Sequence, residues 1–186
     1  PLASSFNTLI IPVDSEHNAI HQCLASCNDH KDISKVIITA SGGPFSAISL
    51  NKFEKIKITD ALKHPNWKMG KKISIDSATM INKLYEVIEA KNIFNIPYKK
   101  IKILIHPKSY VHALLKFSNG MIKIIAHDTT MKIPIFNTLY FNSDQKLKTK
   151  NIDINNLNNL NFQKVNLKRY PVIKLLNFLP NKPSLF

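Results

Sequence analysis

The sequence is poor in cysteine, glycine and arginine, and it has no long hydrophobic run. Its two cysteines, Cys23 and Cys27, among 186 residues exclude a disulfide-stapled scaffold, and they are better explained as buried free thiols than as half of a metal site. The four glycines form no G-x-G-x-x-G pattern, so the fingerprint of a dinucleotide-binding turn is missing. No stretch approaches the roughly 18 apolar residues of a membrane span. These absences favour a globular domain whose thiols suit a reducing cytoplasm.

The chain carries a large positive charge that comes almost entirely from lysine. The formal net charge is +14, and 25 of the 26 basic residues are lysine, Arg169 being the exception. Sequence-specific nucleic-acid recognition relies on the bidentate guanidinium group, so we expect no nucleic-acid partner. Without a membrane span we also expect no membrane partner. Lysine, isoleucine and asparagine supply 71 residues, which indicates a bias toward AT-rich codons. A basic module that binds polyanions is the alternative, and the charge would also attract an anionic substrate.

The hydrophobic pattern predicts both strands and helices. Short apolar runs bounded by turn residues are typical of strands, and apolar residues at helical spacing are typical of helices. The Asn119-Gly120 pair favours a hairpin turn. The predicted strands are 8–13, 35–40, 101–105, 110–117 and 121–127, and the main predicted helices are 16–26 and one helix from 76 or 77 to 94. We therefore expect an α+β fold, close to α/β, with a mixed sheet packed against helices and a long active-site loop.

Two segments show no clear periodicity. Residues 44–72 contain Pro44, Pro65 and Trp67, and so long a weakly patterned stretch is typical of a functional loop or lid. Residues 143–168 are rich in asparagine and lysine, which predicts a peripheral tail.

Asp14 and Glu16 lie two positions apart where the first predicted strand ends. Carboxylates at this spacing could converge on a hard divalent cation. Helix capping explains them as well, because Asp14 or Ser15 could cap the next helix and Glu16 would favour its N-terminus. Both interpretations stay open at this point.

A second polar group follows the strand that ends at Ala40. Ser41-Gly42-Gly43 would expose backbone N–H groups in a turn with little side-chain bulk, which could hold a phosphate together with the serine hydroxyl. Ordinary turns contain the same residues, so the signal is weak alone.

A third group lies on one edge of the helix predicted after Ser77. Asn82, Lys83 and Glu86 are three or four residues apart, so Asn82 and Lys83 could bind phosphate oxygens while Glu86 reaches a metal. The alternative is a solvated Lys–Glu pair worth a few tenths of a kcal/mol. Glu89, one turn further on, has no predicted role.

Histidines and one tryptophan complete the candidates. His64, Trp67 and Met69 fall in the 44–72 segment, where they could cover a ligand and exclude water or could equally anchor the core. His106 and His112 flank the end of a strand and are predicted to be structural.

Several long motifs, which follow one another in a fixed order, resemble those of a known enzyme family. They are Pro12-Val-Asp-Ser-Glu-His-Asn-Ala-Ile20, Thr39-Ala-Ser-Gly-Gly-Pro-Phe45, His64-Pro-Asn-Trp-Lys-Met-Gly-Lys-Lys-Ile-Ser-Ile-Asp-Ser-Ala-Thr-Met80, Asn82-Lys83, Glu86 and Leu104-Ile-His-Pro-Lys-Ser109. The set closely resembles the 1-deoxy-D-xylulose 5-phosphate reductoisomerases, from about Thr8 to about Leu176 and thinly between 143 and 168.

The resemblance implies an oxidoreductase and isomerase of the methylerythritol phosphate route to isoprenoids. Members of the family use NADPH and a divalent metal, Mn²⁺ or Mg²⁺ with Co²⁺ as a further possibility, to convert 1-deoxy-D-xylulose 5-phosphate into 2-C-methyl-D-erythritol 4-phosphate. The family also implies a phosphosugar substrate, a homodimer and a bacterial cytoplasmic location.

The family's motifs assign roles to named residues. Metal ligands fall on Asp14, Glu16 and Glu86, and catalytic roles on Glu16, Glu86, His64 and the flap aromatic Trp67. The nicotinamide side falls on Gly70, Met69 and Met131, and the role of His112 stays open. Substrate-binding residues fall on Ser15, Glu16, Ser41, His64, Ser77, Asn82, Lys83 and Glu86.

The resemblance covers only the middle of the family's enzyme. The Rossmann-like NADPH domain and the C-terminal helical domain have no counterpart here, so we expect a truncated segment that turns over only with those domains. Residues 1–142 would form the catalytic domain with a flexible loop at about 44–72, and 143–186 a connection toward the helical domain. Leu84 and Tyr85 stand where the family usually has Gly and Leu, which keeps a decayed, non-catalytic descendant as an alternative.

Overall fold

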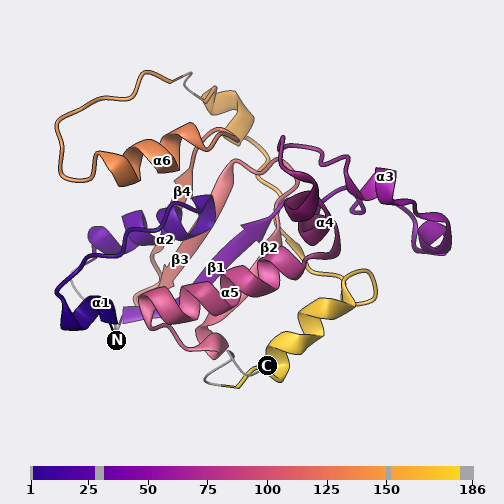
Figure 1. Cartoon of the computed structure of the whole chain (residues 1–186), viewed down its shortest axis with the longest axis horizontal. Coiled ribbons are helices and arrows are strands. Elements are labelled where there is room, and N and C mark those ends of the chain that lie inside the picture. The colour runs from indigo at the N-terminus through magenta and orange to yellow at the C-terminus, as the bar shows by residue number, and fades with distance from the viewer. Residues whose placement is uncertain (1, 28–31, 150–151, 181–186) are drawn as a thin grey trace.

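A mixed five-stranded sheet forms the centre of the molecule. The computed structural model describes residues 2–27, 32–149 and 152–180, and the strand order is β4-β3-β1-β2-β5 (Figure 1). Strand β1 is parallel to β2 and antiparallel to β3, which confirms the predicted α+β fold. The strands are β1 (Ile33–Ala40), β2 (Ile101–Ile105), β3 (Val111–Phe117), β4 (Ile122–Ala126) and β5 (Gln163–Lys164).

Two helices, α2 (Ser15–Ala25) and α5 (Ile81–Phe94), cover one face of this sheet (Figure 1). Ile20 of α2 and Val87 of α5 pack with Val36, Ile38 and Leu115 of the sheet in one buried cluster. Full burial of a side chain of this size contributes about 1.5–3 kcal/mol. The cluster thereby fixes the two helices beside each other, and the predicted helix 16–26 is confirmed.

The remaining helices are short and lie around the sheet. They are α1 (Leu2–Ser5), η2 (Leu50–Lys55), α3 (Ile58–Ala61), α4 (Lys71–Thr79), η3 (Tyr98–Lys100), α6 (Lys132–Leu139), η4 (Ile154–Leu157) and η5 (Pro171–Asn177). Among the described residues, no helix has both the length and the apolar character needed to cross a membrane. Both cysteines are free; Cys23 is buried and Cys27 is half-buried.

The predicted strand 8–13 is wrong. These residues have no strand conformation, and Leu9 and Ile10 are exposed. Pro12 has no N–H to donate to a sheet, and its carbonyl instead accepts hydrogen bonds from Asn18 Nδ2 and Thr138 Oγ1, both at 3.1 Å. The segment is therefore held by side chains of α2 and α6.

The predicted continuous helix 76–94 is also wrong, because it is two helices. Met80 has a left-handed conformation with φ +66° and ends α4 before α5 begins at Ile81. Its side chain is buried with Ala40, Ile105 and Tyr170. Packing of this methionine therefore maintains a backbone conformation that the local sequence does not favour.

The predicted hairpin is confirmed, whereas the C-terminal tail contains a strand that was not predicted. Strands β3 and β4 flank Ser118-Asn119-Gly120, and Gly120 has φ +88°. In the region 143–168, β5 pairs antiparallel with β2, with Lys164 opposite Leu104. Two residues are too few to show a periodic pattern, which explains the omission.

Candidate metal and anion site

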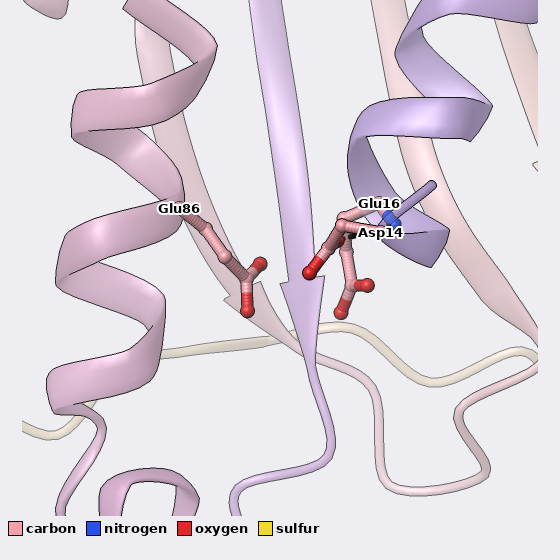
Figure 2. Close-up of side chains that lie close together, drawn as sticks. All are labelled: Asp14, Glu16 and Glu86. Atoms are coloured by element: carbon pink, nitrogen blue, oxygen red, sulfur yellow. Dashed lines mark hydrogen bonds between the residues drawn. The ribbon is translucent and has the colours of Figure 1, made fainter. Parts of the chain in front are cut away.

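Three carboxylates meet between α2 and α5. Asp14 and Glu16 come from the start of α2 and Glu86 from the second turn of α5, and their side chains point toward one another near the end of β1 (Figure 2). One oxygen of each lies within 4.8 Å of the others. Asp14 also caps α2, because its Oδ1 accepts from Glu16 N at 3.1 Å. Asp14 therefore caps the helix and also belongs, with Glu16, to the carboxylate cluster, so both features expected of this pair occur together.

Lys83 lies among these carboxylates. Its buried ammonium donates to Glu16 Oε1 at 2.7 Å and to Glu86 Oε2 at 2.6 Å. Asn82 Nδ2 donates to the other Glu86 oxygen at 2.6 Å, and Ser15 Oγ donates to Glu16 Oε2. The contacts of Lys83 and Asn82 thus join the predicted anion-binding residues to the predicted metal ligands in one network.

The electrostatics of the cluster reflect an excess of negative charge. Burial and the charges of Glu16 and Asp14 raise the pKa of Glu86 well above its usual value, despite Lys83. The side chain of Asp14 is 41% exposed, yet desolvation of its carboxylate and the neighbouring Glu16 raise its pKa to about 6. Burial also opposes ionisation of Glu16, but Lys83 and His112 outweigh it and lower the pKa of Glu16 to about 2. A cation would relieve this repulsion.

This donor set fits a hard divalent cation. All three side chains offer carboxylate oxygens, which Mg²⁺ and Mn²⁺ prefer to nitrogen or sulfur ligands. The oxygens are close enough for small side-chain rotations to bring them onto one ion. Asp14, Glu16 and Glu86 would be the residues that hold it.

A polar turn faces the same space from the end of β1. Gly42 and Gly43 have φ +86° and +62°, and a Cβ on Gly43 would lie 2.9 Å from the carbonyl oxygen of Ser77. Only glycine fits this approach without a shift. The turn is therefore packed directly against the end of α4, which brings Ser77 close to Ser41.

The hydroxyl of Ser41 is oriented by two donors. His64 Nδ1 accepts from the backbone N–H groups of Asn66 and Trp67, at 3.2 and 2.9 Å, so the proton of the neutral ring is on Nε2. His64 Nε2 therefore donates to Ser41 Oγ at 3.0 Å, and Gly43 N donates to the same oxygen at 2.9 Å. Because Oγ accepts twice, its own hydrogen is available to a ligand.

Carboxylates, turn and loop enclose one cavity of about 250 Å³. Every predicted site residue except Gly70 lines it; Gly70 is the N-cap of α4 and lies outside the lining. Residues 44–72, predicted as a loop, contribute His64, Trp67 and Met69, although they also contain η2 and α3. The lining residues from the prediction are Asp14, Ser15, Glu16, Ser41, His64, Trp67, Met69, Ser77, Asn82, Lys83, Glu86 and Met131.

His112 lines the cavity as well, and it has a structural partner. Its ring stacks on that of His127 at 3.7 Å between centroids, and its Nε2 donates to the His127 carbonyl oxygen at 3.2 Å. Burial and the neighbouring His127 lower the pKa of His112 to about 4. Trp67 meets the His112 ring edge-to-face at 6.2 Å. His106 lies elsewhere, with Nδ1 bonded to Asn161 O at 3.0 Å.

Sequence reasoning assigned no site role to several residues of this region, and three of them make specific contacts there. Thr39 and Ser109 line the cavity, and Ser109 Oγ accepts from Asn66 Nδ2 at 2.7 Å, which ties the loop to the β2–β3 connection. His17 Nε2 donates to the Glu86 carbonyl oxygen at 2.9 Å and so joins α2 to α5. His17, Thr39 and Ser109 all lie inside the motifs that carry the resemblance, which were their only signal.

Fold and site together define a domain in which a carboxylate cluster that fits a divalent cation lies beside a polar turn that fits a small anion. Residues 10–94 match the family model described as the C-terminal domain of 1-deoxy-D-xylulose 5-phosphate reductoisomerase. The reductoisomerase of Pelagibacter ubique (strain HTCC1062) is 60% identical over 97% of this chain and 46% of its own length. That of Clostridium novyi (strain NT) is 46% identical over 93% of this chain and 45% of its own length.

Solved structures agree with these sequences. A reductoisomerase in complex with NADPH, fosmidomycin and magnesium superposes with a TM-score of 0.87 and 36% identity, over 95% of this chain and 46% of that one. The Zymomonas mobilis enzyme in complex with NADPH gives a TM-score of 0.82 at 36% identity, over 95% of this chain and 45% of that one. The chain belongs to the 1-deoxy-D-xylulose 5-phosphate reductoisomerase family. It spans about half the length of the curated relatives it matches.

Proposed function

We propose that this chain is the metal- and substrate-binding part of an NADPH-dependent reductoisomerase. The enzyme would convert 1-deoxy-D-xylulose 5-phosphate into 2-C-methyl-D-erythritol 4-phosphate. The observation that supports this proposal most directly is that three carboxylates and a turn with a free serine hydroxyl line the same cavity. A metal site beside an anion site is what a phosphorylated hydroxyketone needs, because its carbonyl and hydroxyl oxygens and its phosphate must be held at the same time.

The carboxylates Asp14, Glu16 and Glu86 would hold Mg²⁺ or Mn²⁺, with Co²⁺ as a further candidate. Such a cation supplies Lewis-acid polarisation of the substrate's oxygens, and NADPH supplies the hydride. Lys83 is bonded to two of these carboxylates, so its charge stabilises their ionised state. Ser15 keeps Glu16 oriented through the hydrogen bond from its hydroxyl.

The phosphate would bind to Ser41, Ser77, Asn82 and Lys83, with His64 closing from the loop. Ser41 has a free hydroxyl hydrogen, and Lys83 adds positive charge. Binding a group remote from the reacting carbons provides energy that orients those carbons. Trp67, Met69 and Met131 contribute apolar surface to the same cavity, which would exclude water and receive the nicotinamide ring beside Gly70.

The domain limits form part of the proposal. Residues 1–142 would be the catalytic unit, with the 44–72 loop moving on substrate binding, and 143–186 would connect it to a further domain. The contacts of Asn66 with Ser109 and of His64 with Ser41 support a defined closed position of that loop.

The exposed edge of the sheet bears on the oligomeric state. We infer a homodimer because β4 lies at the sheet edge and exposes Ile122 and Ile124, and Met121 directly before it is exposed as well; their exposed fractions are 53%, 46% and 59%. In the described part of the chain, no strand pairs with the outer edge of β4, and such an edge favours pairing with another strand.

We also propose a bacterial cytoplasmic location, which the free thiols and the bacterial relatives support.

The test uses the full-length protein that its gene encodes. We expect NADPH oxidation that requires both the phosphosugar and Mn²⁺. Glu86→Gln should weaken Mn²⁺ binding roughly 100-fold or more, whereas Glu89→Gln, at a 56% exposed position, should change it less than twofold. Equal effects of the two variants would refute the assigned ligand set. Metal binding without any turnover would favour the non-catalytic descendant that Leu84 suggests.

A further inference from the structure

The Ser41-Gly42-Gly43 turn receives a hydrogen bond from a residue far along the chain. Tyr170 is 3% exposed, and its hydroxyl donates to the Gly42 carbonyl oxygen at 2.5 Å across 128 positions. Tyr170 does not line the cavity. Its contact is therefore with the back of the turn, not with the space where a ligand would bind.

The bonded carbonyl shares a peptide unit with the N–H group that orients Ser41. The Gly42 carbonyl and the Gly43 N–H belong to one planar trans peptide, so they point in opposite directions. Tyr170 bonds the carbonyl end, and Ser41 Oγ accepts from the N–H end at 2.9 Å. Fixing one end of the plane fixes the other.

This peptide needs an external restraint. Both flanking residues are glycines with positive φ, and glycine populates left- and right-handed conformations almost equally. A rotation of the Gly42–Gly43 peptide would withdraw the N–H from Ser41 Oγ. The Tyr170 hydroxyl opposes that rotation, because its hydrogen bond would then be lost in a buried site.

The segment around Tyr170 is itself well anchored. Strand β5 pairs with β2, and Asn166 then builds a turn in which its carbonyl oxygen accepts from Tyr170 N at 2.9 Å. The neighbouring Arg169, the only arginine, donates through Nη1 to the carbonyl oxygens of Phe45 and Ile48. Tyr170 packs with Ala40 and Met80, both of which line the cavity. Tyr170 therefore packs against the residue before the turn, and Arg169 is bonded to the backbone that follows it.

We propose that Tyr170 is a positioning residue that holds the Gly42–Gly43 peptide, and through it the Ser41 hydroxyl, in the orientation that binds the substrate's phosphate. Arg169 holds the adjoining 45–48 backbone in the same way. The inference rests on the proposed function, because it takes Ser41 as a phosphate ligand. It adds that the C-terminal segment, which contains none of the assigned site residues, determines affinity for the anion.

The experiment compares Tyr170→Phe with the wild type in the full-length protein. The probes are inorganic phosphate, whose dissociation constant is measured by calorimetry, Mn²⁺ alone, and the phosphosugar in steady-state kinetics. We expect phosphate to bind about tenfold more weakly and KM to rise similarly. Mn²⁺ affinity should change less than twofold and kcat less than threefold. A general loss of folding would instead lower the number of Mn²⁺ sites and leave the phosphate affinity of the folded fraction unchanged.

Tyr98→Phe is the matched control. The Tyr98 hydroxyl is buried and has no hydrogen-bond partner, so the same chemical change there should leave phosphate binding unaffected. A double-mutant cycle with Ser41→Ala tests the route of action: in that background Tyr170→Phe should weaken phosphate binding less than twofold. An equal, tenfold effect in both backgrounds would overturn the proposal.

The outcomes separate this inference from the function beneath it. If wild-type protein binds phosphate, and Ser41→Ala weakens that binding while Tyr170→Phe does not, only the positioning role is wrong. If phosphate does not bind, or Ser41→Ala has no effect, the proposed phosphate site is wrong and the positioning role falls with it.

Discussion

Lys83 and Glu86, one turn apart on α5, form a buried ion pair in which Nζ lies 2.6 Å from Oε2. The same ammonium lies 2.7 Å from Glu16, so Lys83 is bonded to two of the three proposed metal ligands. A lysine in this position offsets negative charge that a divalent cation would also offset. Lysine and metal therefore compete for the same carboxylates.

Replacing Lys83 should separate these two roles. Lys83→Met leaves buried carboxylates unpaired, which should destabilise the metal-free protein by about 3–5 kcal/mol, and Mn²⁺ should restore most of that loss. In the absence of substrate, Mn²⁺ should bind about tenfold more tightly, while phosphate binds more weakly. Thermal unfolding with and without Mn²⁺ and a metal titration measure both effects. Lys72→Met, which removes an exposed lysine paired with Asp76, should change neither; weaker Mn²⁺ binding by Lys83→Met would contradict the competition.

The carboxylates of the cluster should contribute to the pH dependence of stability in opposite senses with and without metal. The pKa of Asp14 is raised to about 6 and that of Glu86 is raised as well, so these groups take up protons in the folded state before they do in the unfolded state. Their contribution to the stability of the metal-free protein is therefore greatest at low pH and is lost as pH rises through 6. Bound Mg²⁺ requires the ionised forms and reverses the trend. The stacked histidines contribute in the opposite sense, since burial lowers the pKa of His112 to about 4 and lowers that of His127 as well. The carboxylate contribution is therefore measured as the difference between the wild type and Asp14→Asn, from unfolding curves between pH 5 and 8 in EDTA and in Mg²⁺. Parallel differences in the two media would refute it.

Gly43 should tolerate no side chain. Gly43→Ala combines a φ of +62° with a Cβ 2.9 Å from the Ser77 carbonyl oxygen, which should cost about 2–3 kcal/mol of stability and most of the affinity for phosphate. Gly120→Ala is the control, since Gly120 also has positive φ but has no atom within 4 Å of an added Cβ. It should cost about 1 kcal/mol. Denaturant unfolding measures the difference, and equal costs would show that the contact with Ser77 does not matter.

His64 should act through both ring nitrogens, and two variants distinguish them. His64→Asn keeps an acceptor for the N–H groups of Asn66 and Trp67 but loses the donor to Ser41, whereas His64→Ala loses both. One hydrogen bond is worth about 1 kcal/mol, so KM for the phosphosugar should rise roughly fivefold in the first variant and further in the second. Proteolysis of the 44–72 loop should increase only in His64→Ala. Equal proteolysis of both variants would exclude the capping role of Nδ1.

Much of the fold was predictable because its elements carry local patterns. The strands of the hairpin and the helix carrying Ile20 and Leu24 have periodic apolar residues, and the turn between β3 and β4 has Asn119-Gly120. The elements that were predicted wrongly or missed depend on partners that are distant in the sequence. Met80 adopts its left-handed conformation because it packs with Tyr170 and Ile105, and β5 exists because β2 offers it an edge. Neither partner is visible in a local window.

The features of the candidate site can likewise be divided into those that the sequence predicted and those that it did not. The metal ligands, serines and loop residues were assigned through long motifs, and the structure brings all of them except Gly70 to one cavity. The bonds between Lys83 and both carboxylates were not predictable, because helical spacing relates Lys83 to Glu86 but says nothing of Glu16 on another helix. The tautomer of His64 and the role of Tyr170 likewise follow from three-dimensional contacts alone.

The bond from Tyr170 to Gly42 spans 128 positions, and this has a consequence for the order of folding. The carboxylates at 14, 16 and 86 all lie in the first half of the described chain, and the strands β1 to β4 on which α2 and α5 pack are complete at Ala126. The anion turn at 41–43 is completed only by residues made much later in synthesis. Contacts between such distant positions carry a larger loop-closure cost and slow folding. On the ribosome, the cation site should therefore become competent before the site for the substrate's phosphate.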